Sequence, residues 1–263
     1  MGASGRILLC LGLTLGVAEG AFELDNWANG LPLQAGGWAG NPAALSRAPC
    51  SGWRLVYYRP FALDQLHFAS LMARRSGVGW GVAGALTSFG FDLYRETSGR
   101  LKAGLHWRQW GAGGEWGLGQ LSGAGTKSRL GWWWGLGIEA TGLGPWEVGL
   151  WQQSGPGPWR DRRVFLQVAY RHGDGSILRG HGRRAKGGRL DLSAGRPLGA
   201  ARLEVGTRGG PRRFAVGLKA RTKRWSGYYW VKIHPYLGLS QGLAVGNACC
   251  WSKGRPRNYI GVD

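Results

Sequence analysis

Acidic residues are scarce in this chain of 263 residues. Asp and Glu total 14 against 34 Lys and Arg, which gives a formal net charge of +20 at pH 7. Proline is also low, at 11 residues beside 50 glycines, so the glycine excess does not belong to a disordered Pro/Gly tract. The hydrophobic content of 43% predicts a folded chain, and a length of 263 residues is enough for one domain or for two.

Cysteine is too sparse to organise the fold. Beyond Cys10 in the N-terminal apolar run, only Cys50, Cys249 and Cys250 remain. Three cysteines make neither a disulfide scaffold nor a zinc site. A single bridge from Cys50 to Cys249 or Cys250 and a set of free thiols both stay open.

Catalytic motifs are lacking as well. The five histidines have no metal-ligand spacing, and no Gly-Lys-Ser/Thr phosphate loop occurs. Residues 238–242 match G-x-S-x-G, but no histidine follows Ser240, and residues 79–84 match G-x-G-x-x-G without a surrounding βαβ unit. We therefore expect no enzyme activity, no catalytic, cofactor-binding or metal-binding residues, and no cofactor.

The N-terminus has the pattern of an export signal. Arg6 precedes an apolar run over residues 7–17, and Ala18 and Gly20 are small residues at the −3 and −1 positions of a cleavage site. We predict a signal peptide over 1–20, an N-terminal segment over 21–50 and one β-barrel domain over 51–263. The alternative for the first segment is a membrane anchor.

Alternation with period two dominates the rest of the chain. Apolar residues occupy every second position around 78–86, 101–107, 130–138, 146–150, 164–170, 201–205, 214–220 and 237–245. This period is typical of strands with one apolar face. Glycine-rich turn sequences separate the runs and predict on the order of a dozen strands. Residues 62–75 are ambiguous, because they also fit a helix.

The second face of these strands favours a membrane barrel. It carries glycine, alanine, serine and arginine, which cover a solvent face poorly but suit a narrow lumen. Aromatic residues gather at the expected strand ends, as in the girdles of outer-membrane barrels: Trp53, Trp80, Trp107, Trp110, Trp116, Trp146, Trp159, Trp225 and Trp251. We predict an all-β, antiparallel transmembrane barrel of roughly 12–14 strands, in which Trp132 and Trp134 face lipid and Trp133 fills the interior. A soluble β-sandwich with a tryptophan-rich core is the alternative.

A short element before the first strand suggests a family. Asn41-Pro42-Ala43 lies in the segment 37–45, with Asp64 and Tyr94-Arg95-Glu96 further along. This arrangement resembles the PorV/PorQ-like outer-membrane proteins, which are relatives of the FadL-type long-chain fatty acid transporters. The resemblance implies a porin-like barrel in the bacterial outer membrane that transports a small solute or assists secretion.

The basic residues have three interpretations. Some are expected to line the lumen, where they would favour anions or lock the interior by pairing with Glu147 and Glu204; the candidates for the lumen are Arg171, Arg202, Glu204, Arg213 and Lys219. Others would contact lipid phosphates. Nucleic-acid binding also fits the charge and the aromatic content, but exported proteins seldom meet nucleic acid, so we do not expect it.

The sequence therefore predicts three kinds of partner: outer-membrane lipid, a small anionic or hydrophobic solute, and secretion-machinery proteins. The expected function is passage of small solutes or a secretion-accessory role. The alternative is a secreted soluble β-sandwich that binds a polyanion such as an acidic polysaccharide.

Overall fold

A computed structural model describes residues 40–47, 50–155, 163–174, 176–184, 189–198, 201–208, 213–222, 224–234 and 238–247. These residues form fourteen antiparallel strands and two short 3-10 helices. The helices are η1 (Pro42–Ser46) and η2 (Pro60–Ala62). The strands are β1 (Cys50–Arg59), β2 (His67–Ser76), β3 (Trp80–Phe91), β4 (Tyr94–Trp107), β5 (Trp110–Gly123), β6 (Thr126–Leu143), β7 (Trp146–Ser154), β8 (Arg163–Arg171), β9 (Ile177–Arg184), β10 (Arg189–Leu198), β11 (Ala201–Arg208), β12 (Arg213–Arg221), β13 (Trp225–His234) and β14 (Gly238–Asn247).

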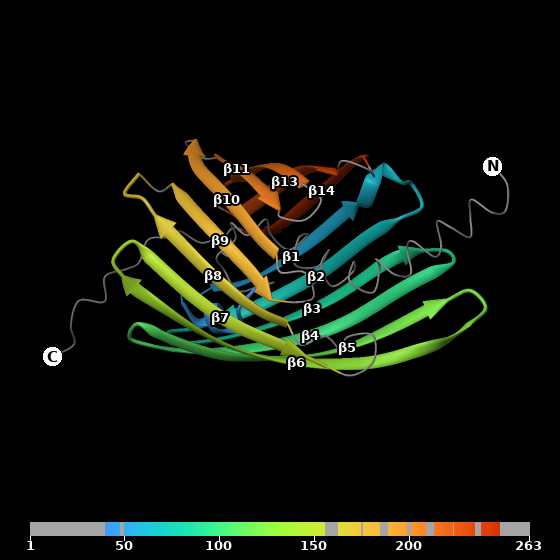
Figure 1. Ribbon diagram of the computed structural model, residues 1–263, viewed down its shortest axis with the longest axis horizontal. Coiled ribbons are helices and arrows are strands. Elements are labelled where there is room, and N and C mark those ends of the chain that lie inside the picture. Colours follow the sequence, from blue (N-terminus) through green and yellow to red (C-terminus); the bar gives the residue numbers. More distant parts are fainter. Residues whose placement is uncertain are drawn as a thin grey trace.

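The strands close into one barrel (Figure 1). Each pairs with its neighbours in sequence, and β1 completes the ring by pairing with β14, with Leu55 opposite Val245. The prediction of an antiparallel barrel of roughly 12–14 strands is confirmed, at its upper limit. A single closed sheet is not the two-sheet sandwich of the alternative prediction. The ambiguity over residues 62–75 is also resolved, since β2 is a strand.

Two ends of the barrel differ in their connections. At one end, which we call the turn end, the links are 77–79, 108–109, 144–145, 172–176, 199–200 and 222–224. The opposite loop end includes the longer links 60–66 and 155–162. β1 starts and β14 finishes at the turn end, so both described chain ends lie there.

Burial alternates along the strands as predicted. In β2 every second residue is exposed and every other is buried. In β6 Leu130 is 74% exposed, Trp132 and Trp134 are exposed, and Trp133 is 1% exposed. The interior position of Trp133 depends on Gly117, since a Cβ there would overlap the Trp133 indole. The Leu130–Ile138 segment thus lies on a strand with an apolar outer face and a small-residue inner face.

Aromatic residues of β1, β3–β5, β7, β8 and β13 form a girdle along part of the turn end. Trp53 and Trp225 meet with ring centroids 5.8 Å apart, and Trp146 meets Tyr170 at 4.8 Å. Most of the predicted strand-end tryptophans belong to this girdle. Trp116 does not, because it lies in the middle of β5 opposite Trp134; alternation alone gave its face but not its depth.

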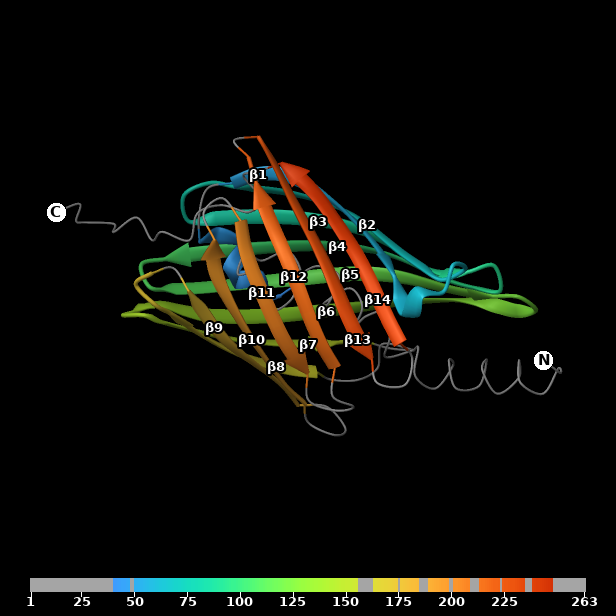
Figure 2. The same cartoon turned by 90° about the horizontal axis from the view of Figure 1, so that it is seen from above.

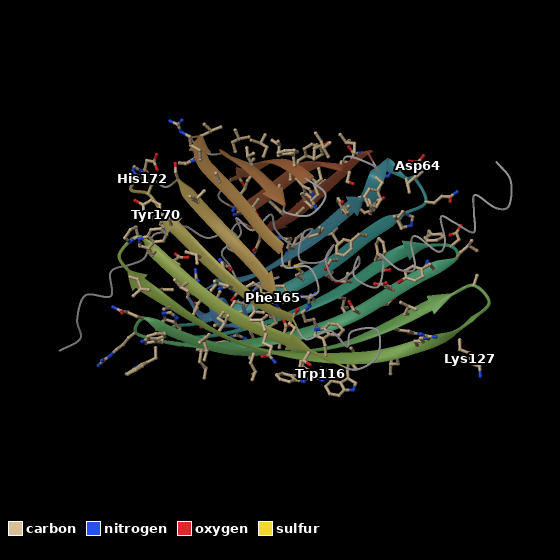
Figure 3. The ribbon with its side chains drawn as sticks, in the orientation of Figure 1. Asp64, Trp116, Lys127, Phe165, Tyr170 and His172 are labelled. Carbon is tan, nitrogen blue, oxygen red and sulfur yellow. The ribbon has the colours of Figure 1, made fainter. Side chains whose placement is uncertain are left out.

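The β5–β6 hairpin is the longest of the barrel, with strands of 14 and 18 residues. Figure 2 shows it extending past its neighbours at the loop end, and Figure 3 places Lys127 at its tip. No helix among the described residues is long and apolar enough to cross a membrane. The predicted signal peptide (1–20), most of the segment 21–50, and Trp159, Cys249, Cys250 and Trp251 lie outside the described residues.

Candidate functional site

The interior of the barrel contains its own N-terminal segment. Residues 40–47, which we call the plug, include η1 and pack inside the sheet near the turn end. Asn41 caps η1 by accepting a hydrogen bond from the Ala43 N–H (3.1 Å), and Pro42 stands at the first helical position. Both choices favour a helix start, so this short turn forms locally. Residues 41–46 are buried.

Glycines on the barrel wall make the room for the plug. A Cβ on Gly81 would lie 2.5 Å from the Leu45 carbonyl oxygen, one on Gly104 2.5 Å from that of Pro42, and one on Gly113 2.6 Å from the Ala43 nitrogen. Real Cβ atoms do not approach backbone so closely. We call these three residues, together with Gly137, which faces Asn41, the glycine seat. It accounts for four of the glycines on the inner face of β3–β6, where a side chain would collide with the plug.

Polar groups of the wall fasten the plug backbone and its cap. The Asn41 side-chain amide donates to the Ile138 carbonyl (2.6 Å). Arg74 donates to the Leu45 carbonyl (2.6 Å), and Lys102 donates to the Gly40 carbonyl (2.8 Å). A buried carbonyl without a hydrogen-bond partner costs free energy, so the bonds from Arg74 and Lys102 stabilise the plug in its position. The same bonds offset the cost of burying the two cations.

Arg47 joins the end of the plug to two carboxylates. Its guanidinium donates to both oxygens of Glu139 (2.8 and 2.6 Å) and to Glu147 (2.7 Å). Glu147 also accepts a hydrogen bond from Arg171 (2.8 Å). Burial by itself would lower the pKa of Arg47, but the adjacent carboxylates of Glu139 and Glu147 raise it above its ordinary value. Arg47 is therefore a permanent cation. We call its hydrogen bonds to Glu139 and Glu147 the Arg47 clamp, and through Glu147 the clamp is linked to Arg171.

Above the plug, toward the loop end, lies a layer of buried charge. Lys102 and Glu115 form an ion pair at 3.0 Å with side chains almost wholly buried. Gln153 of β7 donates to Glu115 of β5 across Gly135 of the strand between them, β6. Arg54 and Arg100 are also buried on the inner face. Cations thus outnumber carboxylates in this layer.

An aromatic cluster fills the loop half of the interior. Tyr228 stacks on Trp230 at 5.2 Å, and Tyr58 lies 6.2 Å from Trp230. The Lys232 ammonium is 4.5 Å from the centroid of the Tyr58 ring, within the range of a cation–π contact. Apolar side chains from β1–β3 and β12–β14 complete the cluster. The part of the interior between β1–β3 and β12–β14 is therefore packed with side chains rather than open.

The five predicted lumen residues have different outcomes. Arg171 lies on the inner side, where it bonds Glu147. Lys219 alternates with the exposed outer residues of β12, so it is on the inner face. Arg202 lies opposite Lys219 in the β11–β12 pair, Glu204 opposite Gly217, and Arg213 opposite Arg208. The side chains of Arg202, Glu204 and Arg213 lie outside the described part of the structure.

Sequence reasoning missed most of the charged interior. Arg54, Arg74, Arg100 and Lys232 all stand on the inner face, and alternation within their strands was the available signal. Arg47 had no such signal, because it lies in the plug, outside any strand. Asn41-Pro42-Ala43 was singled out in the sequence, but nothing there indicated that it lies inside the barrel.

No family model matches the chain, and no curated protein matches it. Solved structures do resemble the barrel. The KdgM porin aligns with a TM-score of 0.45 and 11% identity over 75% of this chain and 98% of its own. A triple mutant of the Rhodopseudomonas blastica porin aligns with a TM-score of 0.43 and 9% identity over 76% and 99%. With so few side chains in common, the function of this chain has to be argued from its own residues.

Proposed function

We propose that the protein is a bacterial outer-membrane barrel that passes small solutes through a lumen gated by its own N-terminal plug. One observation carries this: the barrel has an apolar outside and a charged inside. Leucine, valine and tryptophan face outward on the strands, while Arg54, Arg100 and Lys102 are buried within. A closed sheet leaves no unpaired backbone edge, so it can cross hydrocarbon.

The orientation follows from the ends of the barrel. Outer-membrane barrels have short turns on the periplasmic side and longer loops outside. The two longest links, 60–66 and 155–162, are at the loop end, and the turn end carries the start of β1 and the aromatic girdle, so we assign the turn end to the periplasm. The plug then stands in the periplasmic half of the lumen, and the β5–β6 hairpin projects outward from the cell.

The plug also supports kinship with PorV/PorQ-like and FadL-type barrels. In those families an Asn-Pro-Ala element leads into the barrel, and here Asn41-Pro42-Ala43 does so from inside the lumen. A secretion-accessory role is the second candidate, favoured by the packed interior. In either role we propose that the protein is not an enzyme.

Fractionation with heat-modifiability tests the location. We expect the chain, expressed with its first 20 residues, to be recovered in outer membranes and to migrate differently on a gel before and after boiling. The shift arises because a closed, fully paired sheet resists detergent until it is heated. Recovery as a soluble protein without a mobility shift would contradict the proposal.

The charge of the lumen predicts selectivity for anions. In planar bilayers under a salt gradient, the reversal potential should indicate preference for anions, because the inner face carries more cations than carboxylates. Lys219→Glu should lower this preference, whereas Lys127→Glu at the tip of the β5–β6 hairpin should not. Cation selectivity of the wild-type protein, or equal effects of the two variants, would contradict a cationic lumen.

A further inference from the structure

A groove crosses the outer face of the barrel over β2–β6. It has a volume of about 760 Å³. Its floor consists of small outward-facing residues, and larger apolar side chains rise on its sides. The floor residues are Ala73, Gly84, Ala103 and Gly114, and the sides are Val82, Leu101, Trp116, Trp134 and Leu136. Figure 3 shows Trp116 on the outer side of the sheet.

The glycines of this groove differ from those of the glycine seat. A Cβ on Gly84 would meet nothing closer than Leu101 at 3.5 Å, and one on Gly114 nothing closer than 3.7 Å. These are ordinary contacts, so the packing of the protein does not demand glycine there. Their effect is on the outside, where they leave an apolar trough wide enough for a ligand.

Four charged residues border the groove, and of these only Arg75 has an exposed side chain; Arg74, Lys102 and Glu115 are buried on the inner face. Arg75 is exposed on the outer face, one residue before the end of β2 at the turn end. Trp53 of the aromatic girdle lies opposite Ala73, on the same face. Tryptophan rings mark the depth of lipid headgroups in membrane barrels. Arg75 therefore stands at headgroup depth, and the trough runs from it toward the hydrocarbon.

The charge of Arg75 discriminates between occupants. Among the described side chains, no carboxylate lies on the outer face of the strands: Glu96, Glu115, Glu139 and Glu147 alternate with the outer residues, and Asp64, Asp92 and Asp174 lie in connections. A second copy packed on the groove would therefore bury Arg75 without a described counter-charge, at high cost. A lipid phosphate supplies that charge in a geometry that guanidinium matches.

We infer that the groove is a binding site for an anionic glycerophospholipid, with one acyl chain in the trough and the phosphate on Arg75. This site lies on the opposite side of the sheet from the lumen and is independent of solute passage. It would hold a lipid of the leaflet at the turn end more tightly than the surrounding annulus.

Native mass spectrometry of the purified barrel in detergent tests the inference. Dioleoyl phosphatidylglycerol is the probe, and dioleoylglycerol, which has the same chains without the phosphate, is its control. We expect one phosphatidylglycerol to bind selectively. Arg75→Gln should weaken it by about tenfold, the range of a hydrogen-bonded charge. Gly114→Leu should fill the trough and weaken it similarly.

Two control variants show whether a loss of lipid binding is specific to the groove. Arg95→Gln removes another exposed outer-face arginine, at the loop end, and Gly99→Leu adds bulk to the outer face at Gly99; both should bind phosphatidylglycerol like the wild type. All variants are first checked for the heat-dependent gel shift, so that only folded barrels are compared. The inference is overturned by equal binding of dioleoylglycerol, by undiminished binding to Gly114→Leu or Arg75→Gln, or by a dimer that excludes the lipid.

Discussion

Arg47→Met is expected to lower the resistance of the barrel to urea markedly. Both oxygens of the Glu139 carboxylate, whose side chain is 1% exposed, accept hydrogen bonds from the Arg47 guanidinium. The variant removes these donors and leaves the buried carboxylate without them. Removing one partner of a buried pair costs roughly 3–5 kcal/mol. Because Arg47 and Glu147 are partly exposed, we expect ~2–3 kcal/mol here. The measurement is the urea midpoint at which the unboiled gel mobility is lost.

Two further variants show whether the loss comes from the stranded carboxylate. Arg95→Met removes an exposed arginine that forms no ion pair with a described carboxylate, and its midpoint should equal that of the wild type. Arg47→Met/Glu139→Gln removes the buried charge as well and should recover much of the lost stability. If Arg47→Met and Arg95→Met had the same midpoint, the Arg47 clamp would contribute nothing to the fold.

The barrel itself could be predicted because its strands repeat one simple rule. In each strand, apolar outward-facing residues alternate with small or charged inward-facing residues. This pattern can be recognised within a single strand, without knowledge of contacts between distant residues. The segment around Trp133 illustrates this, since alternation alone assigned its face and its neighbours' faces. The ambiguity over 62–75 arose because Asp64 fits a helix N-cap and Gly77 fits the position after a helix C-terminus, and only pairing with β1 and β3 decides for a strand.

The site was harder to predict because its contacts join distant parts of the chain. The glycine seat brings residues from β3–β6 onto η1, and no periodicity relates Gly81 or Gly137 to Leu45 or Asn41. Glu147 was expected to pair with a lumenal arginine, but the sequence did not indicate that Arg47 shares it. The inward-facing glycines were interpreted as leaving room in the lumen, whereas in the structure the backbone of the plug occupies the space beside Gly81, Gly104 and Gly113.

Gly104→Val is expected to displace the plug. A valine Cβ at this position would lie 2.5 Å from the Pro42 carbonyl oxygen, and backbone cannot swing aside as a side chain can. Such overpacking costs about 1–3 kcal/mol, which raises the ratio of displaced to seated plug by roughly 5- to 150-fold. Two measurements report the ratio of displaced to seated plug. One is the conductance of the barrel in planar bilayers. The other is the rate of trypsin cleavage after Arg47, which the Arg47 clamp holds in place when the plug is seated.

Gly99→Val is the matched control, because Gly99 lies on the same strand but faces outward, where its Cβ would meet only Leu86 at 3.5 Å. It should conduct and resist trypsin like the wild type. Faster cleavage together with higher conductance in Gly104→Val would identify the plug as the gate of a solute path. Faster cleavage with unchanged conductance would mean that the plug is not the gate, and the secretion-accessory role would then be favoured. Unchanged cleavage would show that the glycine seat does not hold the plug, because a clash with backbone at 2.5 Å cannot be absorbed without moving one of the two.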